Sequence, residues 1–309
     1  PDPVILKSDG FPTYALAAMV DDHEMQISHV MRADEWIPTW PVHVQILEAL
    51  GWQEPVWIHV PQVLGNDGKK LSKRHGDTSV TEYLEAGFLP EAIINYLALV
   101  GWSYDDHTEI MSIQELIERF DIKRIKPSPG VFDREKLLHF NGVYLRAMSP
   151  EKLAPLVAPY LSKAELISPE PTADELARIA EVLPLVQDRL KLLSDAPEAL
   201  DFFLAEPAVY DPALLVPKKT EPRDTLKVLD DVHALVNDVA DWTAETLDAK
   251  FHAYVNDAGL KIPQVFMPTR VAVTGRTQSP GLFETLVVLG KATVLQRLAA
   301  ARTVLADSL

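Results

Sequence analysis

The 309-residue sequence contains no cysteine. This excludes a disulfide framework and every metal or redox site built on thiolates. The sequence also has no apolar run near the ~20 residues that a membrane-spanning helix needs. Its first ten residues, PDPVILKSDG, have neither the basic start nor the apolar core of a signal peptide. We therefore expect a cytoplasmic protein that does not bind membranes.

The glycine-rich patterns of nucleotide-binding proteins are missing as well. Neither G-x-G-x-x-G nor G-x-x-x-x-G-K-[ST] occurs, which disfavours a nicotinamide oxidoreductase. Basic residues are in the minority, with 29 Lys and Arg against 45 Asp and Glu, for a net charge of -16. This balance argues against indiscriminate binding to nucleic acid or membranes. It is compatible with nucleic acid held by local basic patches.

Signals for strands are confined to the start of the chain. Residues 25–31 alternate between apolar and polar side chains, and residues 56–60, VWIHV, are β-rich and lie between prolines. Between them, Pro41 is expected to begin a helix that Gly51 ends. This alternation of strand and helix predicts a short parallel sheet.

Signals for helices dominate the rest of the chain, so we predict an α/β fold followed by a mostly α fold. Three pairs have the spacing of a capping box, namely Ser79 with Glu82, Ser112 with Glu115 and Thr172 with Glu175. Proline-rich joints between residues 211 and 222 indicate a boundary between two helical subdomains. The predicted domains are residues 1–75, 76–148 and 149–309, with the subdomain boundary near residues 205–222.

A cluster of four cations in six residues, KKLSKR at residues 69–74, interrupts this acidic chain. A glycine-bounded loop can wrap such ammonium groups around a polyphosphate and neutralise charge that develops on it. The alternative is a solvated basic turn, and composition alone favours that alternative.

Residues 70–74, KLSKR, resemble the second ATP-binding motif of class I aminoacyl-tRNA synthetases, usually written KMSKS. Further segments resemble the glutamyl-tRNA synthetase family, in the order of that family: KSDGFPTY, VDDHEM, HVMRADEW, GFLPEAIINYLALVGWS, VFDREKL, NGVYLR and TGRTQSPGLFETLVVLGK. The resemblance covers nearly the whole chain. It implies the second half of a Rossmann-type nucleotide-binding domain, a helical stem-contact region and an all-α anticodon-binding region.

The resemblance also implies an activity. Glutamate would attack the α-phosphate of ATP to give glutamyl-adenylate and pyrophosphate, and the glutamyl group would then pass to the terminal adenosine of tRNA(Glu). Mg²⁺ normally accompanies the ATP. Some family members hold zinc through cysteines. Because this sequence has no cysteine, we expect no zinc. Most members are monomers, and we expect a monomer.

In this family the KLSKR loop grips the ATP phosphates and stabilises the leaving pyrophosphate. The resemblance implies that Lys73 is the principal phosphate contact, that Lys70 assists it, and that Ser72 belongs to the same ATP site. It also implies that Glu35, beside Trp36, touches the nucleotide.

Two residues match the glutamate pocket of the family. Tyr14 matches the tyrosine of its PTY motif, and Arg32 ends a strand-like segment, where ligand contacts of α/β proteins commonly lie. The fork of a guanidinium suits a carboxylate of glutamate. From the residues alone, a packed aromatic and a surface salt bridge are the alternatives. Ala18 stands where the family commonly has Asn, which removes one polar contact.

Contacts to tRNA are implied in two places. Residues 119–136 hold six cations and three acids, and Lys123, Arg124 and Lys126 would contact phosphates on the inner side of the tRNA; an ordinary charged helix end is the alternative. Arg189 matches an arginine that reads the third anticodon base and accompanies preference for glutamate tRNA. Relaxed members often carry Gln there, and Gln187 lies two residues away. We expect the discriminating type.

The first ATP motif of the family, HIGH, does not occur in the sequence. We therefore expect a truncated glutamate–tRNA ligase that begins within the catalytic domain and is inactive by itself. The alternatives are one half of a split synthetase and a non-catalytic tRNA-binding protein. A metal site at Asp21, Asp22, His23 and His29 is not expected, because adjacent residues rarely converge on one ion.

Overall fold

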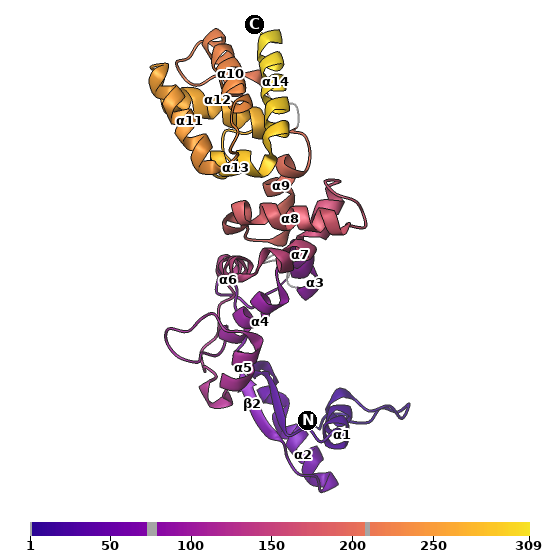
Figure 1. Cartoon of the computed structure of the whole chain (residues 1–309). Coiled ribbons are helices and arrows are strands. Elements are labelled where there is room, and N and C mark those ends of the chain that lie inside the picture. The colour runs from indigo at the N-terminus through magenta and orange to yellow at the C-terminus, as the bar shows by residue number, and fades with distance from the viewer. Residues whose placement is uncertain (1, 73–78, 208–210) are drawn as a thin grey trace. The chain divides into compact units, whose positions relative to one another are not determined.

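The computed structural model describes residues 2–72, 79–207 and 211–309. The chain divides into two compact units, Pro1–Phe140 and Asn141–Leu309, and helix α6 runs across the boundary between them. The elements of the first unit (Figure 1) are α1 (Tyr14–Glu24), β1 (His29–Ala33), η1 (Asp34–Thr39), α2 (Trp40–Leu50), β2 (Val56–Val60), α3 (Val80–Ala86), α4 (Pro90–Leu99), α5 (Ile113–Arg119), η3 (Ile122–Arg124) and α6 (Arg134–Ala147).

The predicted parallel sheet is confirmed, since β1 and β2 pair in parallel over five residues each. Helix α2 joins them, and Gly51 ends that helix in the left-handed region at φ 70°, as predicted. Met19 of α1 packs on Ile46 and Leu47 of α2 to form a small core beside the sheet.

The position of the first strand differs from the prediction. The strand begins at His29, not at residue 25, because the preceding residues complete helix α1. Gln26 takes a positive φ of 57°, and the backbone N–H of Ile27 donates to the carbonyl of Asp22 at 2.9 Å. The alternating pattern at residues 25–28 therefore belongs to a helix end.

Short helices fill the rest of the first unit, and side chains fix their ends. Ser112 and Glu115 form the predicted capping box, in which each side chain accepts from the backbone N–H of the other residue. The buried amide of Asn95 accepts from the N–H of Met111 and donates to the carbonyl of Glu109, both at 3.0 Å. This amide fastens the loop before α5 to helix α4.

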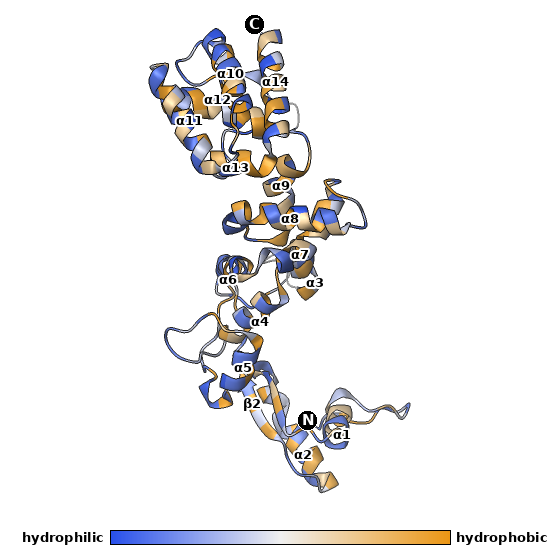
Figure 2. Ribbon diagram, viewed as in Figure 1, coloured by the Kyte–Doolittle hydropathy of each residue, from blue (hydrophilic) through white to orange (hydrophobic). Residues whose placement is uncertain are grey.

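Helices make up the second unit, and the part of it that the structure describes contains no strand. Its longer helices carry apolar residues along their lengths (Figure 2). Helix α13 begins directly after Gly281, so Ser279 and Pro280 lie in the preceding loop. The elements are α7 (Pro150–Lys163), α8 (Ala173–Val186), η4 (Gln187–Arg189), η5 (Leu193–Asp195), α9 (Ala196–Leu204), η6 (Pro212–Leu215), α10 (Pro222–Asn237), α11 (Ala244–Asp257), α12 (Ile262–Thr274), α13 (Leu282–Leu289) and α14 (Lys291–Asp307).

Candidate functional site

Arg32 lies at the carboxyl end of β1, and its register partner on β2 is His59. The Nε of Arg32 donates to Nε2 of His59 at 3.2 Å, and its Nη1 donates to Nδ1 of His43 at 2.9 Å. Its Nη2 is buried, and among the described residues it has no hydrogen-bond partner. Two histidines therefore hold the guanidinium, and its Nη2 group remains free to donate to a ligand.

Aromatic rings complete the surroundings of Arg32. Its guanidinium carbon lies 4.9 Å from the ring centre of Trp57 and 5.8 Å from that of Trp36. The Tyr14 ring lies 5.0 Å from the Trp36 ring and 6.3 Å from that of His43. The two predicted glutamate contacts, Tyr14 and Arg32, thus belong to one cluster.

The charges in this cluster are unbalanced. Burial lowers the pKa of Arg32. Burial also lowers the pKa of both His43 and His59, and the charge of Arg32 lowers each further. Across the described parts of the chain, no carboxylate lies within 4.0 Å of Arg32. The surface salt bridge that the sequence left open is therefore not seen in this structure.

The loop that leads into the KLSKR motif and is predicted to bind ATP, here called the KLSKR hairpin, forms a tight hairpin before residue 72. The N–H of Leu71 donates to the carbonyl of Val63 at 2.9 Å, and the N–H of Gly65 donates to that of Lys69 at 2.8 Å. Gly68 makes the turn at a φ of 73°, in the region that glycine adopts most readily. The predicted phosphate contact Lys73 and the last residue of the motif, Arg74, lie outside the described residues.

Lys70 and Glu35, both predicted to contact ATP, touch each other. The Nζ of Lys70 lies 2.7 Å from Oε2 of Glu35, to which Gln62 also donates at 3.3 Å. The two charged side chains keep 58% and 45% of their surface exposed. An exposed ion pair of this kind contributes ~1 kcal/mol or less, so a polyphosphate can displace it. Ser72 lines a neighbouring hollow of about 510 Å³.

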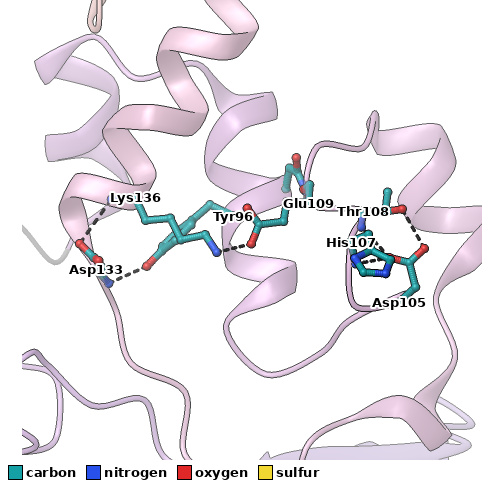
Figure 3. Close-up of polar contacts among 8 residues, drawn as sticks. Tyr96, Asp105, His107, Thr108, Glu109, Asp133 and Lys136 are labelled. Atoms are coloured by element: carbon teal, nitrogen blue, oxygen red, sulfur yellow. Dashed lines mark hydrogen bonds and ion pairs between the residues drawn. The ribbon is translucent and has the colours of Figure 1, made fainter.

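The KLSKR hairpin is anchored to the segment that leads into α6. The N–H of Leu64 donates to the carbonyl of Gly130 at 2.9 Å, and the N–H of Phe132 donates to the carbonyl of Leu64 at 2.8 Å. Figure 3 shows how the start of α6 is held in turn: the hydroxyl of Tyr96 accepts from the N–H of Asp133 at 2.6 Å. The hairpin therefore has a fixed base.

Gly130 is expected to be necessary for that anchor. A Cβ at this position would lie 1.7 Å from the carbonyl oxygen of Val100, too close for any side chain. We expect Gly130→Ala to destabilise the first unit by about 1–3 kcal/mol and to weaken ATP binding through the displaced hairpin. Gly101→Ala is the control, since a Cβ there meets no atom within 4 Å. Urea unfolding and ATP titration measure both effects, and equal behaviour of the two variants would contradict the role of Gly130.

The predicted stem-contact cations are exposed. Lys123 and Arg124 lie in η3, which Asp121 caps by accepting from the N–H of Lys123 at 2.9 Å. Within the described residues, no acidic side chain pairs with Lys123, Arg124 or Lys126. The nearby Arg119, in contrast, pairs with Glu115 at 3.3 Å. The three cations are thus available for phosphates.

In the second unit, the structure distinguishes Arg189 from Gln187. Gln187 is buried, and its Nε2 donates to the carbonyls of Leu145 and Met148 at 2.7 Å each. Arg189 is exposed and donates from Nη2 to the carbonyl of Ser279 at 3.1 Å. Of the two, Arg189 is at the surface and Gln187 is in the interior.

A hollow of about 640 Å³ lies beside Arg189. Arg276 and Gln278 also line it, and Arg270 donates to the carbonyl of Pro280 at 2.7 Å nearby. The resemblance of the segment TGRTQSP to the family singled out none of these side chains. Their proximity to Arg189 depends on the packing of helices some 80 residues apart, for which the sequence holds no local signal.

The described residues offer neither a metal site nor a membrane span. No group of three or more His, Asp or Glu side chains is arranged to hold a metal ion in residues 2–72, 79–207 and 211–309. In the same residues, no helix is both long enough and apolar enough to cross a membrane.

Comparison with known proteins gives the class of the chain. Residues 1–139 match the family model of the class I tRNA synthetases (E and Q), catalytic domain, and residues 152–302 match the model of an anticodon binding domain. The chain thus combines the catalytic and anticodon-binding parts of a class I synthetase of the glutamate and glutamine type.

Individual relatives narrow this class. The glutamate–tRNA ligase of Herpetosiphon aurantiacus is 70% identical over 308 residues, which cover 100% of this chain and 62% of that protein. That of a Roseiflexus species is 48% identical, over 98% of this chain and 60% of the relative. A crystal structure of a glutamate tRNA ligase from Elizabethkingia meningosepticum in complex with its amino acid superposes with a TM-score of 0.85 at 31% identity, covering 98% of this chain and 62% of that one.

The chain belongs to the glutamate–tRNA ligase family. It spans about 60% of the length of the curated relatives that it matches. The predicted order of an α/β part followed by a mostly helical part is confirmed by these matches.

Proposed function

We propose that the chain carries the glutamate pocket, part of the ATP site and the anticodon-binding region of a glutamate–tRNA ligase. The observation that carries this proposal is Arg32, a guanidinium enclosed by rings and imidazoles with a buried donor left over. Such a group suits the carboxylate of an amino acid. Glu35 lies three residues after Arg32 in the sequence and pairs with Lys70 of the KLSKR hairpin. Glutamate and ATP would therefore meet beside Arg32 and Glu35.

In the proposed reaction, the α-carboxylate of glutamate attacks the α-phosphorus of ATP. A carboxylate–phosphorus bond forms, the bond to pyrophosphate breaks, and glutamyl-adenylate results. The terminal adenosine hydroxyl of tRNA(Glu) then attacks the activated carbonyl and AMP leaves. Arg32 and Tyr14 would hold glutamate, while Lys70 and Lys73 would offset charge on the phosphates and Ser72 and Glu35 would position the nucleotide.

Mg²⁺ is expected to enter with the nucleotide, because it is usually held by substrate phosphates and waters. The described residues contain no acidic cluster that would hold it. The phosphates of ATP and water molecules would therefore hold the Mg²⁺.

We also propose which residues contact tRNA, what the three domains do, and the oligomeric state and cellular location of the protein. Lys123, Arg124 and Lys126 would bind phosphates on the inner side of the tRNA, and Arg189 would read the third anticodon base. Residues 1–75, 76–148 and 149–309 would be the catalytic, stem-contact and anticodon-binding domains. A monomer in the cytoplasm belongs to the same proposal.

The test is charging of glutamate tRNA by the 309-residue polypeptide, with tRNA binding recorded in the same samples. Because the sequence contains no HIGH tetrad, we expect binding without charging. That outcome agrees with a piece of a synthetase, with one half of a split enzyme or with a non-catalytic tRNA-binding protein. A chain that binds neither tRNA nor ATP would contradict the proposal, and charging at an ordinary rate would contradict the expectation of inactivity.

Removal of the three exposed cations is expected to weaken tRNA binding without changing its specificity. The triple variant Lys123→Ala, Arg124→Ala and Lys126→Ala should lower the affinity for every tRNA alike, and should reduce the slope of log K against log salt by about one for each phosphate that is no longer neutralised. Arg119→Ala is the control, because Arg119 is already paired with Glu115. An unchanged salt slope in the triple variant would show that these cations do not touch phosphates.

A further inference from the structure

The partners of Arg32 are unusual for a half-buried guanidinium. It has two imidazole acceptors, His43 at 2.9 Å and His59 at 3.2 Å, and two indole faces, but within the described residues no carboxylate at ion-pair distance. Buried cations are ordinarily paired with an acid. The exception calls for a chemical reason.

We propose that His43 and His59 decide which amino acid the pocket accepts: as neutral acceptors they hold the guanidinium in place and leave its full charge for the side-chain carboxylate of the ligand. This inference rests on the proposed function. It adds that glutamate is chosen over glutamine by the charge state of the residues behind Arg32, and it makes the two histidines positioning residues.

The hydrogen bonds require both imidazoles to be neutral. An arginine can only donate, so the nitrogen that faces it must carry a lone pair. His43 therefore has its proton on Nε2, and His59 has its proton on Nδ1. A protonated imidazole has no acceptor, so its protonation would break its bond to Arg32. Burial, which lowers the pKa of both histidines, favours the neutral forms.

The other charged groups near the cluster do not cancel the charge of Arg32. Asp22 of α1 acts on Arg32 from beyond ion-pair distance. Burial and the neighbouring Asp21 raise the pKa of Asp22, against a smaller lowering by Arg32. Asp34, at the start of η1, acts on His59 and, among the described residues, makes no ion pair with Arg32. The nearest partners of the guanidinium remain uncharged.

Glutamine fits this site less well than glutamate for two reasons. Its amide brings no charge, so the half-buried cation stays uncompensated. Its amide nitrogen is also a donor, and it cannot bond to a guanidinium that has donors only. The α-carboxylate is common to glutamate and glutamine, so a contact to it cannot distinguish them. Discrimination therefore falls on the side-chain group.

The test compares two isosteric substitutions that differ only in charge. In His43→Asn, the amide oxygen replaces Nδ1 as a neutral acceptor, whereas in His43→Asp a carboxylate stands at the same place. His59→Gln and His59→Glu form the second pair, in which the side-chain oxygen replaces Nε2. Ligand-observed NMR with glutamate and with glutamine gives the affinity ratio for each 309-residue variant. Circular dichroism and ATP titration check that each variant is folded.

We expect His43→Asp to lower the glutamate-to-glutamine affinity ratio at least about tenfold, equivalent to 1.4 kcal/mol, because its carboxylate neutralises Arg32. His43→Asn should weaken both amino acids but keep their ratio, and the pair at His59 should behave in the same way. A folded His43→Asp chain with the same ratio as His43→Asn would overturn the inference and leave the proposed function intact. Failure of the unaltered chain to bind glutamate at all would overturn both.

Discussion

Arg297→Met is expected to lower the free energy of unfolding of the helical second unit by about 3–5 kcal/mol. The side chain of Arg297 is only 5% exposed. Its Nη1 donates to the carbonyls of Phe202 and Val273 at 2.7 and 2.8 Å, and its Nη2 donates to that of Ala205 at 2.9 Å. Methionine fills the space but leaves three carbonyl groups in the interior without donors, and each unmet group costs about 1–3 kcal/mol.

Arg302→Met is the matched control for this substitution. Arg302 lies on the same helix, α14, but its side chain is 52% exposed and pairs with Asp230 at the surface. Its removal should change the unfolding free energy by no more than about 1 kcal/mol. Urea unfolding followed by circular dichroism measures both. Equal losses in the two variants would show that the buried guanidinium does not hold α9 and α12 against α14.

Arg32→Met is expected to abolish most glutamate binding while leaving the fold intact. Loss of a desolvated charge pair between Arg32 and a ligand carboxylate should cost at least about 2 kcal/mol, or about thirtyfold in affinity. The unfolding free energy should fall by no more than about 1–3 kcal/mol, because His43 and His59 lose a donor but the free chain also loses a cation whose Nη2 has no partner among the described residues. Binding sites commonly give up stability in this way.

Arg119→Met tests whether that effect belongs to the pocket. Arg119 also lies over an aromatic ring, 4.8 Å from the centre of Tyr104, but it pairs with Glu115. Calorimetric titration with glutamate should show no change in this variant, whereas thermal unfolding should show a small loss of stability. A large loss of stability in Arg32→Met, with glutamate binding unchanged, would mean that Arg32 is a packing residue.

Local rules account for the parts of the fold that the sequence predicted. The capping box of Thr172 and Glu175 and the left-handed end of α2 at Gly51 depend on residues three or four positions apart, so they can be recognised without knowledge of the fold. The strand at residues 56–60 lies between prolines and came out at the same residues. The misplaced start of β1 arose because an alternating pattern over four residues also fits a helix end.

The contacts within the candidate site could be predicted only from the folded structure, not from local sequence patterns. Nothing near Lys70 indicates that Glu35 is its partner, and the pairing of Arg32 with His59 depends on a register between strands 27 positions apart. A parallel sheet does bring the carboxyl ends of its strands to one edge, so His59 could have been suspected once β1 and β2 were placed. His43 offered no such signal, because its place on the buried face of α2 resembles that of a core residue.

The most direct test of the account is equilibrium binding of the 309-residue chain to glutamate tRNA, and to the same tRNA with its third anticodon base exchanged for that of glutamine tRNA. We predict that the exchange weakens binding by about 1–3 kcal/mol and that Arg189→Gln removes the difference. Equal binding of both tRNAs by the unaltered chain would contradict the assignment of Arg189, and absence of tRNA binding would contradict the proposed function.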